Sequence, residues 1–126
     1  MRIILALAAT ALVAGGATAG LAMHKTAHHA AFQINSTSWT YLEKGKPMEN
    51  SIGPDGNFVV HSGAKHIDHG TVVMKNGKAC FTSAMTKEGE ICWTTKPVAI
   101  GAIMKTTSDK GRKLSVKRVK YTPPKM

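Results

Sequence analysis

Short runs in which apolar and polar residues alternate recur along the chain from about residue 36 to residue 121. Glycine, asparagine, aspartate or proline separates one run from the next. This pattern is typical of β-strands joined by tight turns. It predicts about eight strands, over residues 36–42, 48–52, 57–62, 71–75, 78–84, 90–95, 98–107 and 113–121. After the first 19 residues, no run has the period of an amphipathic helix.

The clearest turn signal is Asn76-Gly77, because Asn-Gly between two β-prone runs is the preferred sequence of a type I′ hairpin. This turn places Val73 opposite Cys80. Short turns join most of the other strands, so the expected fold is all-β, an antiparallel meander that forms a small barrel or a strongly curved sheet. A sandwich of two sheets is the alternative. The expected core is filled mainly by aromatic side chains: Trp39, Phe58, Phe81 and Trp93.

The first 19 residues have the composition of a cleaved secretory signal peptide. Arg2 gives a positive start, residues 3–14 are uncharged and largely apolar, and residues 17–19 are the small residues that a signal peptidase recognises. We therefore expect an exported protein, in the periplasm or secreted. An uncleaved anchor is the alternative, since residues 3–23 are about long enough to span a bilayer. No second long apolar run follows, so we expect no transmembrane segment after cleavage.

The sequence divides into four expected segments. Residues 1–19 are the signal peptide, and residues 20–31 are a flexible N-terminal tail with few large apolar side chains. Residues 32–122 form a single β domain, and residues 123–126 form a C-terminal tail that begins with two prolines. The length remaining after cleavage is enough for one domain and too short for two.

Cys80 and Cys92 are the only cysteines. An even number of cysteines in an exported chain predicts a disulfide. A symmetric hairpin centred near Thr86 would place the two residues opposite each other, and their neighbours Phe81 and Trp93 would then lie on the other face of the strands. A redox or metal-binding role is the alternative, although the spacing matches no Cys-x-x-Cys site.

Histidine is concentrated between residues 61 and 69. We expect His66 and His69 to lie on an irregular loop, where they can share a zinc or copper ion with Asp68 or His61 as a further ligand. The alternative is a polar loop without a metal, in which Asp68 accepts backbone N–H bonds at a turn. No other cofactor is expected.

The chain is strongly basic, with a formal net charge of +10, and +9 once Arg2 is removed with the leader. Residues 105–126 account for +7 of this charge. An excess of this kind favours acidic partners, so we expect an anionic or other envelope partner to bind the last strand. The candidate anion-binding residues are Lys113, Lys117, Arg118 and Lys120.

The alternation of this last strand changes phase at Lys117-Arg118, which predicts a β-bulge there. An edge strand that its lysines protect from mispairing is the alternative to an anion-binding role. Specific binding of nucleic acid is not expected, because the last hairpin lacks the interleaved aromatic residues on which bases stack.

The sequence contains no motif of an enzyme active site. It has no Gly-x-Ser-x-Gly, no His-Glu-x-x-His and no glycine-rich phosphate-binding loop. Most of its acidic residues flank predicted turns, where solvated carboxylates are ordinary. We therefore expect a protein that is not an enzyme and has no catalytic residues.

Four strings of residues carry a resemblance to a known group: STSWTY (36–41), HIDHGT (66–71), GKACFTS (77–83) and EICWT (90–94). In these strings the chain resembles small exported bacterial proteins of uncharacterised function. The resemblance covers most of the mature chain and implies export and a compact β domain. It brings no assigned catalytic residues.

A looser likeness is to small lipocalin-like barrels, which include periplasmic protease inhibitors. In those barrels a tryptophan near the first strand plugs the interior, and Trp39 is similarly placed here. Those inhibitors carry their disulfide elsewhere and insert an N-terminal segment into the protease. Residues 20–31 would be the matching segment.

These observations predict an exported, non-enzymatic small β domain that binds an anionic or other partner at the cell envelope. One alternative is a periplasmic protease inhibitor or a ligand-carrying mini-barrel. A second alternative is an envelope protein that binds metal through the histidines at residues 61–69. The sequence does not predict the oligomeric state.

Overall fold

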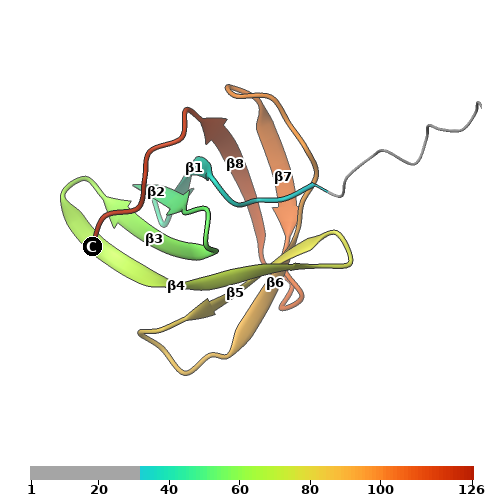
Figure 1. The fold of residues 1–126 in the computed structure, drawn as a ribbon, viewed down its shortest axis with the longest axis horizontal. Helices are drawn as coiled ribbons and strands as arrows, with labels where there is room; N and C mark the ends of the chain where they lie inside the picture. Colours follow the sequence, from blue (N-terminus) through green and yellow to red (C-terminus); the bar gives the residue numbers. More distant parts are fainter. Residues whose placement is uncertain (1–31) are drawn as a thin grey trace, which may run out of the picture. The chain divides into compact units, whose positions relative to one another are not determined.

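The computed structural model of the protein describes residues 32–126. The expected signal peptide and N-terminal tail lie outside the described residues. Eight strands follow one another in the described part (Figure 1): β1 (Thr37–Glu43), β2 (Lys46–Ile52), β3 (Asn57–Ser62), β4 (Lys65–Lys75), β5 (Lys78–Ser83), β6 (Glu90–Thr94), β7 (Ile103–Thr107) and β8 (Lys113–Val119). Residues 32–126 form no helix, so this part of the chain holds none that is long and apolar enough to cross a membrane.

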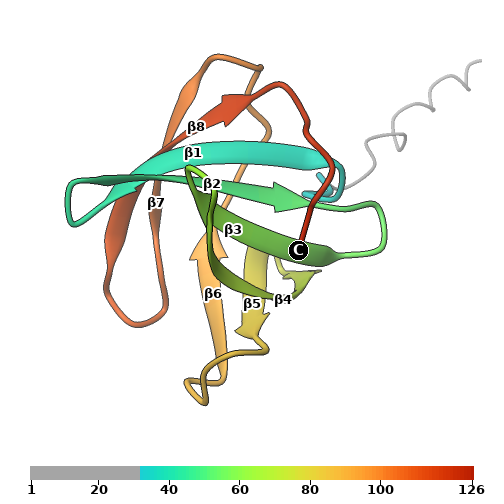
Figure 2. The ribbon, with the colours of Figure 1, turned by 90° about the vertical axis from the view of Figure 1, so that its left-hand side faces the viewer.

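All eight strands belong to one antiparallel sheet in the order β6-β5-β4-β3-β2-β1-β8-β7. Neighbouring strands pair through hairpins, and β8 returns to pair with β1. The sheet curls until its two end strands, β6 and β7, approach each other, which gives a nearly closed barrel (Figure 2). The predicted all-β meander is confirmed.

Side chains close the seam between β6 and β7, because only one isolated bridge, Trp93 to Ser108, pairs the backbone there. The hydroxyl of Thr106 donates to the carbonyl oxygen of Thr94 at 2.5 Å, and Thr107 N donates to the Thr94 hydroxyl at 3.1 Å. At the next position, Asp109 N donates to Cys92 O at 2.9 Å. The seam is therefore the one boundary between barrel strands without a continuous ladder of backbone hydrogen bonds in the described sheet.

The local turn signals gave the correct register. Asn76 and Gly77 both have positive φ, at 50° and 77°, as a type I′ turn requires. Val73 pairs with Cys80 across that hairpin, as predicted. Cys80 also pairs with Cys92, and a disulfide joins them.

The aromatic residues expected in the core all point into the barrel. Trp39 and Phe58 are buried, whereas Phe81 and Trp93 are only partly buried. The rings of Phe58 and Phe81 meet edge to face, with centroids 5.1 Å apart. Ile52, at another inward position, is fully buried. Phe81 and Trp93 lie on the opposite face of their strands from the disulfide, as predicted.

A second, smaller buried layer lies on the outside of the barrel. Ser38, Ser51 and Val59 share one outward row across β1, β2 and β3, yet all three are buried. The Ser38 hydroxyl lies 2.9 Å from the Ser51 hydroxyl and accepts a hydrogen bond from Thr122 N at 2.9 Å. The chain after β8, including the predicted C-terminal tail at residues 123–126, thus lies across the outer face, where Figure 1 places the C-terminus near β3 and β4.

The predicted loop at His66–His69 is wrong, because strand β4 already begins at Lys65. A bulge in the pairing of β3 with β4 explains the error. His61 pairs with His66, and the next residue of β3, Val60, pairs with Asp68, which leaves Ile67 as one extra residue. An extra residue breaks the alternation of inward and outward positions, so the segment lacks the sequence pattern of a strand.

The predicted bulge at Lys117-Arg118 is also wrong. β8 pairs with β1 through Lys117, Arg118 and Val119 without a shift of register. Arg118 keeps the inward phase of Val116, and its Nη1 donates to the carbonyl oxygen of Val98 at 2.9 Å. A long arginine side chain can occupy an inward position near the end of a strand and still reach a polar partner. The inward position of Arg118, rather than a bulge, accounts for the change in the alternation of the sequence at this point.

The predicted strand over residues 98–107 is shorter than expected. β7 begins only at Ile103, and residues 95–102 connect it to β6 as a loop. Pro97 cannot donate to a ladder, and Gly101 has a positive φ of 95°. These two residues end regular pairing before Ile103.

Candidate functional site

The interior of the barrel contains a cavity of about 320 Å³. This volume lies at the lower end of the range of small-molecule sites, about 300–1,000 Å³. Three of the four exposed residues of its lining lie in the β5–β6 and β7–β8 connections: Glu88, Gly89 and Arg112. We therefore place the mouth of the cavity between these two connections.

Aromatic rings form much of the cavity wall. Five of the seven aromatic residues of the chain line it: Trp39, Tyr41, Phe58, Phe81 and Trp93. The alternation of the strands brings them together, because each occupies an inward position on β1, β3, β5 or β6. Aliphatic side chains fill the space between them and include Ile67, Ile91 and Leu114. An apolar molecule of suitable size would find contacts on most sides.

Polar side chains interrupt this apolar wall. Tyr41 lies on β1 and Asn50 on β2, both at inward positions. Burial raises the pKa of the Tyr41 hydroxyl to about 12, and the nearby charge of Glu43 adds to the shift, so the hydroxyl is protonated at neutral pH. Asn50 Oδ1 is buried and has no hydrogen-bond partner among the described residues. A buried acceptor without a partner carries a cost that a donor on a bound molecule would remove.

Asp68 is a further polar group in the cavity wall. Its Oδ1 accepts hydrogen bonds from the Ser83 hydroxyl at 2.6 Å and from His69 N at 2.8 Å. Neither bond uses Oδ2, which accepts no hydrogen bond from residues 32–126. The bulge in β4 creates this arrangement, because it lets Ile67 and Asp68 both line the interior.

An ion pair lies at the mouth of the cavity. Arg112 Nη2 lies 2.9 and 2.8 Å from the two carboxylate oxygens of Glu43. The same guanidinium lies 5.6 Å from the centre of the Trp93 ring, which is a cation–π distance. Arg112 thus bridges the end of β1 and the end of β6 at the edge of the cavity.

The structure brings the three predicted histidine ligands together but separates them from Asp68. His66 Nε2 lies 3.2 Å from His69 Nδ1, and the rings of His61 and His66 are 6.0 Å apart between centroids. All three rings lie on the outer side of β3 and β4, whereas Asp68 lines the cavity. Two nitrogen ligands about 2.0–2.1 Å from a tetrahedral zinc ion lie a little more than 3 Å apart, so the His66–His69 pair has the spacing of two such ligands.

The predicted basic residues also divide between two faces. Lys113 and Lys117 both lie on the outer side of β8, and Lys105 of β7 lies on the same side. All three are exposed, and so is Lys120 beyond the strand. Arg118 does not belong to this surface, because its side chain points inward and donates to Val98 O.

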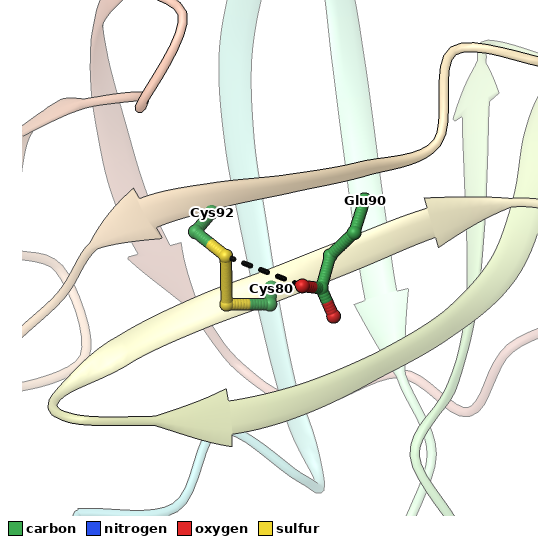
Figure 3. A group of neighbouring side chains, drawn as sticks. All are labelled: Cys80, Glu90 and Cys92. Atoms are coloured by element: carbon green, nitrogen blue, oxygen red, sulfur yellow. Dashed lines mark hydrogen bonds between the residues drawn. A yellow bond between two sulfur atoms is a disulfide. The ribbon is translucent and has the colours of Figure 1, made fainter.

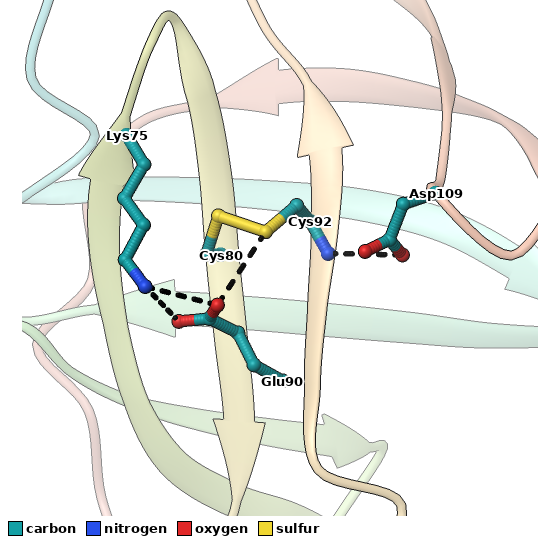
Figure 4. The surroundings of a disulfide bond; sticks show 5 residues. All are labelled: Lys75, Cys80, Glu90, Cys92 and Asp109. Carbon is teal, nitrogen blue, oxygen red and sulfur yellow. Dashed lines mark hydrogen bonds and ion pairs between the residues drawn. A yellow bond between two sulfur atoms is a disulfide. The ribbon is translucent and has the colours of Figure 1, made fainter.

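The disulfide lies on the outer side of β5 and β6. Figure 3 shows that Glu90 points toward it, with a carboxylate oxygen 3.8 Å from Cys92 Sγ. The ligand atoms of Cys80, Cys92 and Glu90 lie within 4.8 Å of one another, as in a metal site, but the disulfide leaves no thiolate to bind an ion. Glu90 instead pairs with Lys75 at 2.9 Å (Figure 4).

No family model, curated protein or solved structure matches this chain. The chemistry of the site therefore follows from the described residues alone.

No pattern in the sequence indicates the cavity, and Asp68 stands out in the sequence only as a possible metal ligand. Tyr41 lies two residues after Trp39, and Asn50 lies between Met48 and Ile52 at strand spacing, so both are in phase with apolar residues. This phase was the available signal that a polar group faces the interior. Glu43 and Arg112 are 69 residues apart, and only the return of β8 to β1 brings them together. No spacing in the sequence indicates this contact.

Proposed function

We propose that the protein is a non-enzymatic binding protein whose barrel takes up a small, mostly apolar molecule. The observation that carries the proposal is the cavity of about 320 Å³ with its wall of aromatic and aliphatic side chains. This corresponds to the ligand-carrying mini-barrel, one of the alternatives that the sequence leaves open. A filled barrel interior would have favoured binding at the outer surface alone.

The burial of the aromatic residues supports this proposal. Phe81 and Trp93 are inward-facing yet only partly buried, since the cavity leaves part of each ring uncovered. Covering apolar surface is favourable by about 25 cal/mol for each Å². A ligand would complete the core that these rings leave open.

The surroundings of Ser83 support a role without catalysis. Ser83 is a hydroxyl in the cavity wall that bonds to a carboxylate, Asp68. Its oxygen also accepts hydrogen bonds from Met85 N at 2.9 Å and Thr86 N at 3.2 Å. No histidine lines the cavity among the described residues, so the serine–histidine pairing of common serine nucleophiles is absent there. Ser83 thus acts as a turn residue, and we assign no catalytic group.

The disulfide supports a place outside the cytoplasm, because such bonds persist mainly in oxidising compartments. We propose that the protein is exported through the leader at residues 1–19 and works in the periplasm or after secretion. The inhibitor alternative depends on residues 20–31, which lie outside the described residues.

The test of the proposed function is the uptake of N-phenyl-1-naphthylamine, an uncharged dye that fluoresces in apolar surroundings. We expect the mature protein to bind the dye in a saturable manner. Ile91→Trp should abolish binding because the larger ring fills the cavity that Ile91 lines. Val73→Trp is the matched control, since Val73 is exposed on the outer side of β4. Equal binding by the two variants would overturn the proposal.

A second candidate function is binding to an anionic envelope surface. The observation that favours it is the row of exposed lysines on the outer side of β7 and β8, none of which forms an ion pair within residues 32–126: Lys105, Lys113 and Lys117. Binding to vesicles rich in phosphatidylglycerol should weaken as salt rises from 50 to 500 mM, because salt screens exposed charges. Replacing the three lysines with glutamine should have the same effect. Binding that ignores both changes would exclude this function.

A further inference from the structure

The cavity is acidic although the chain is strongly basic. The ionisable residues that line it are three acids and one base, which gives a formal charge of −2 in a chain of net charge +10: Glu43, Asp68, Glu88 and Arg112. A barrel interior that takes up fatty acids or other anions needs a cationic group to receive the carboxylate. The formal charge of this cavity lining is negative instead.

The charge of Arg112 is already paired with that of Glu43. Nη2 of its guanidinium contacts both carboxylate oxygens of Glu43, and the guanidinium lies over the ring of Trp93. No lysine and no other arginine lines the cavity among residues 32–126. An anionic ligand would therefore face carboxylates without a free positive charge.

Two hydrogen-bond acceptors of the cavity wall are unused. Asn50 Oδ1 is buried without a partner, and Asp68 Oδ2 accepts no hydrogen bond within residues 32–126. Both residues lie on the inward face, on β2 and β4. Acceptors that lack partners select a ligand that brings donors or positive charge.

The aromatic wall suits the same kind of ligand. The face of an aromatic ring attracts a cation, and the attraction is stronger when water is excluded. Two tryptophans, a tyrosine and two phenylalanines line the same cavity as the carboxylate of Asp68. Sites of this composition bind ammonium groups that carry apolar substituents.

We propose that the cavity binds an organic cation, an amine or quaternary ammonium group on a small apolar body. This inference rests on the proposed function and adds the charge of the ligand. The positive net charge of the chain opposes the approach of a cation. At physiological salt, however, exposed charges more than about 8 Å away are largely screened, whereas contacts inside the barrel are not.

The test compares three probes of one shape that differ in charge. They are benzyltrimethylammonium, its uncharged isostere neopentylbenzene, and the anion phenylmethanesulfonate. Each is titrated into the mature protein at 150 mM salt, with tryptophan fluorescence as the readout, because Trp39 and Trp93 line the cavity. We expect the cation to bind at least tenfold more tightly than the uncharged probe, and the anion not to bind.

Asp68→Asn provides a second measurement, since the amide keeps an acceptor for Ser83 but removes the charge. The ratio of the affinities for the cation and for neopentylbenzene should fall toward one. Asp55→Asn, in the exposed turn before β3, is the control and should leave this ratio unchanged.

Two results would overturn the inference in different ways. Equal affinities for the cation and the uncharged probe would remove the charge preference but leave the proposed function standing. Failure of all three probes to bind would overturn both. The comparison of probes on the unmodified protein decides the matter even if Asp68→Asn fails to fold.

Discussion

Single inward positions give the interior of this barrel its chemistry. Tyr41, Asn50 and Asp68 stand where the alternation of the strands would otherwise place apolar side chains. A buried polar group costs stability unless it is fully hydrogen-bonded. Asp68 has two partners, whereas Asn50 Oδ1 has none within the described part of the chain. Positions that break the local pattern without an internal compensation are expected at functional sites.

The buried hydroxyl of Tyr41 leads to a prediction about pH. Its pKa rises from the usual value of 10.0 to about 12 in the folded protein, chiefly because of burial. The folded state therefore resists ionisation of Tyr41. This ionisation leaves the free energy of unfolding unchanged below pH 10 and lowers it as the pH rises from 10 toward 12. A pKa difference of this size corresponds to about 3 kcal/mol.

Phenolate absorbance in the variant Tyr121→Phe measures this pKa, because Tyr41 is then the only tyrosine. We expect a midpoint near pH 12 in the folded protein and near pH 10 in concentrated urea. A folded-state midpoint near 10 would show that the hydroxyl is not buried in the barrel.

The His66–His69 pair leads to a prediction about metal binding. Zinc or copper at ten times its dissociation constant should stabilise the protein by about 1.4 kcal/mol. For a domain of this size that is a rise of about 5–10 °C in melting temperature. His66→Ala combined with His69→Ala should abolish the rise, because the two ring nitrogens 3.2 Å apart are lost.

The control for this experiment is His28→Ala combined with His29→Ala, a histidine pair of the same size in the predicted tail. It should leave the rise intact. A rise that survives the loss of His66 and His69 would place the metal elsewhere.

At the scale of the strands, turn residues made the pairing predictable, whereas residues that break the alternation made it unpredictable. Asn76-Gly77 fixes one register, which then places Cys80 opposite Cys92 across the next hairpin. These contacts are local, so the sequence was enough to predict them. The β4 bulge at Ile67 and the inward arginine at 118 break the alternation on which strand prediction depends. Both were misjudged for that reason.

The disulfide should matter most for strand β6. This strand has a regular ladder only with β5, and its other edge is held by single hydrogen bonds such as Asp109 N to Cys92 O. Cys80→Ala with Cys92→Ala should lower the free energy of unfolding by about 3 kcal/mol, as expected for the short loop that the bond closes.

Hydrogen exchange should locate this effect. Amides of β6 should exchange faster in the double variant, whereas those of β2, between β1 and β3 in the sheet, should lose only the global difference. An equal increase in the exchange rates of all strands would mean that the disulfide does not stabilise β6 in particular.

At the scale of the whole molecule, the features that depend on closure of the sheet could not be predicted from the sequence. The all-β meander followed from strand spacing and turn signals. A cavity depends on how far eight strands curl and on how much volume the inward side chains fill, and no local pattern reports either quantity. The contact of Glu43 with Arg112 likewise exists only because β8 returns to β1.

Closure also separates the charges of the molecule. The basic excess lies on the outer surface, above all on β7, β8 and the segment that follows, while the lining of the cavity is acidic. Composition alone showed the first and concealed the second, because a net charge of +10 averages over both faces. This separation is the reason why we propose ligands of opposite charge for the outer surface and the interior.

Methyl chemical shifts test the central claim, a small-molecule site inside the barrel, most directly. Saturating N-phenyl-1-naphthylamine is added to protein with ¹³C-labelled methyl groups. We expect ring-current shifts at the inward-facing Ile67, Ala79 and Ile91, and none at the outward-facing Val73 and Ile103. Shifts confined to Val73 and Ile103, or none at any of the five residues, would contradict the account.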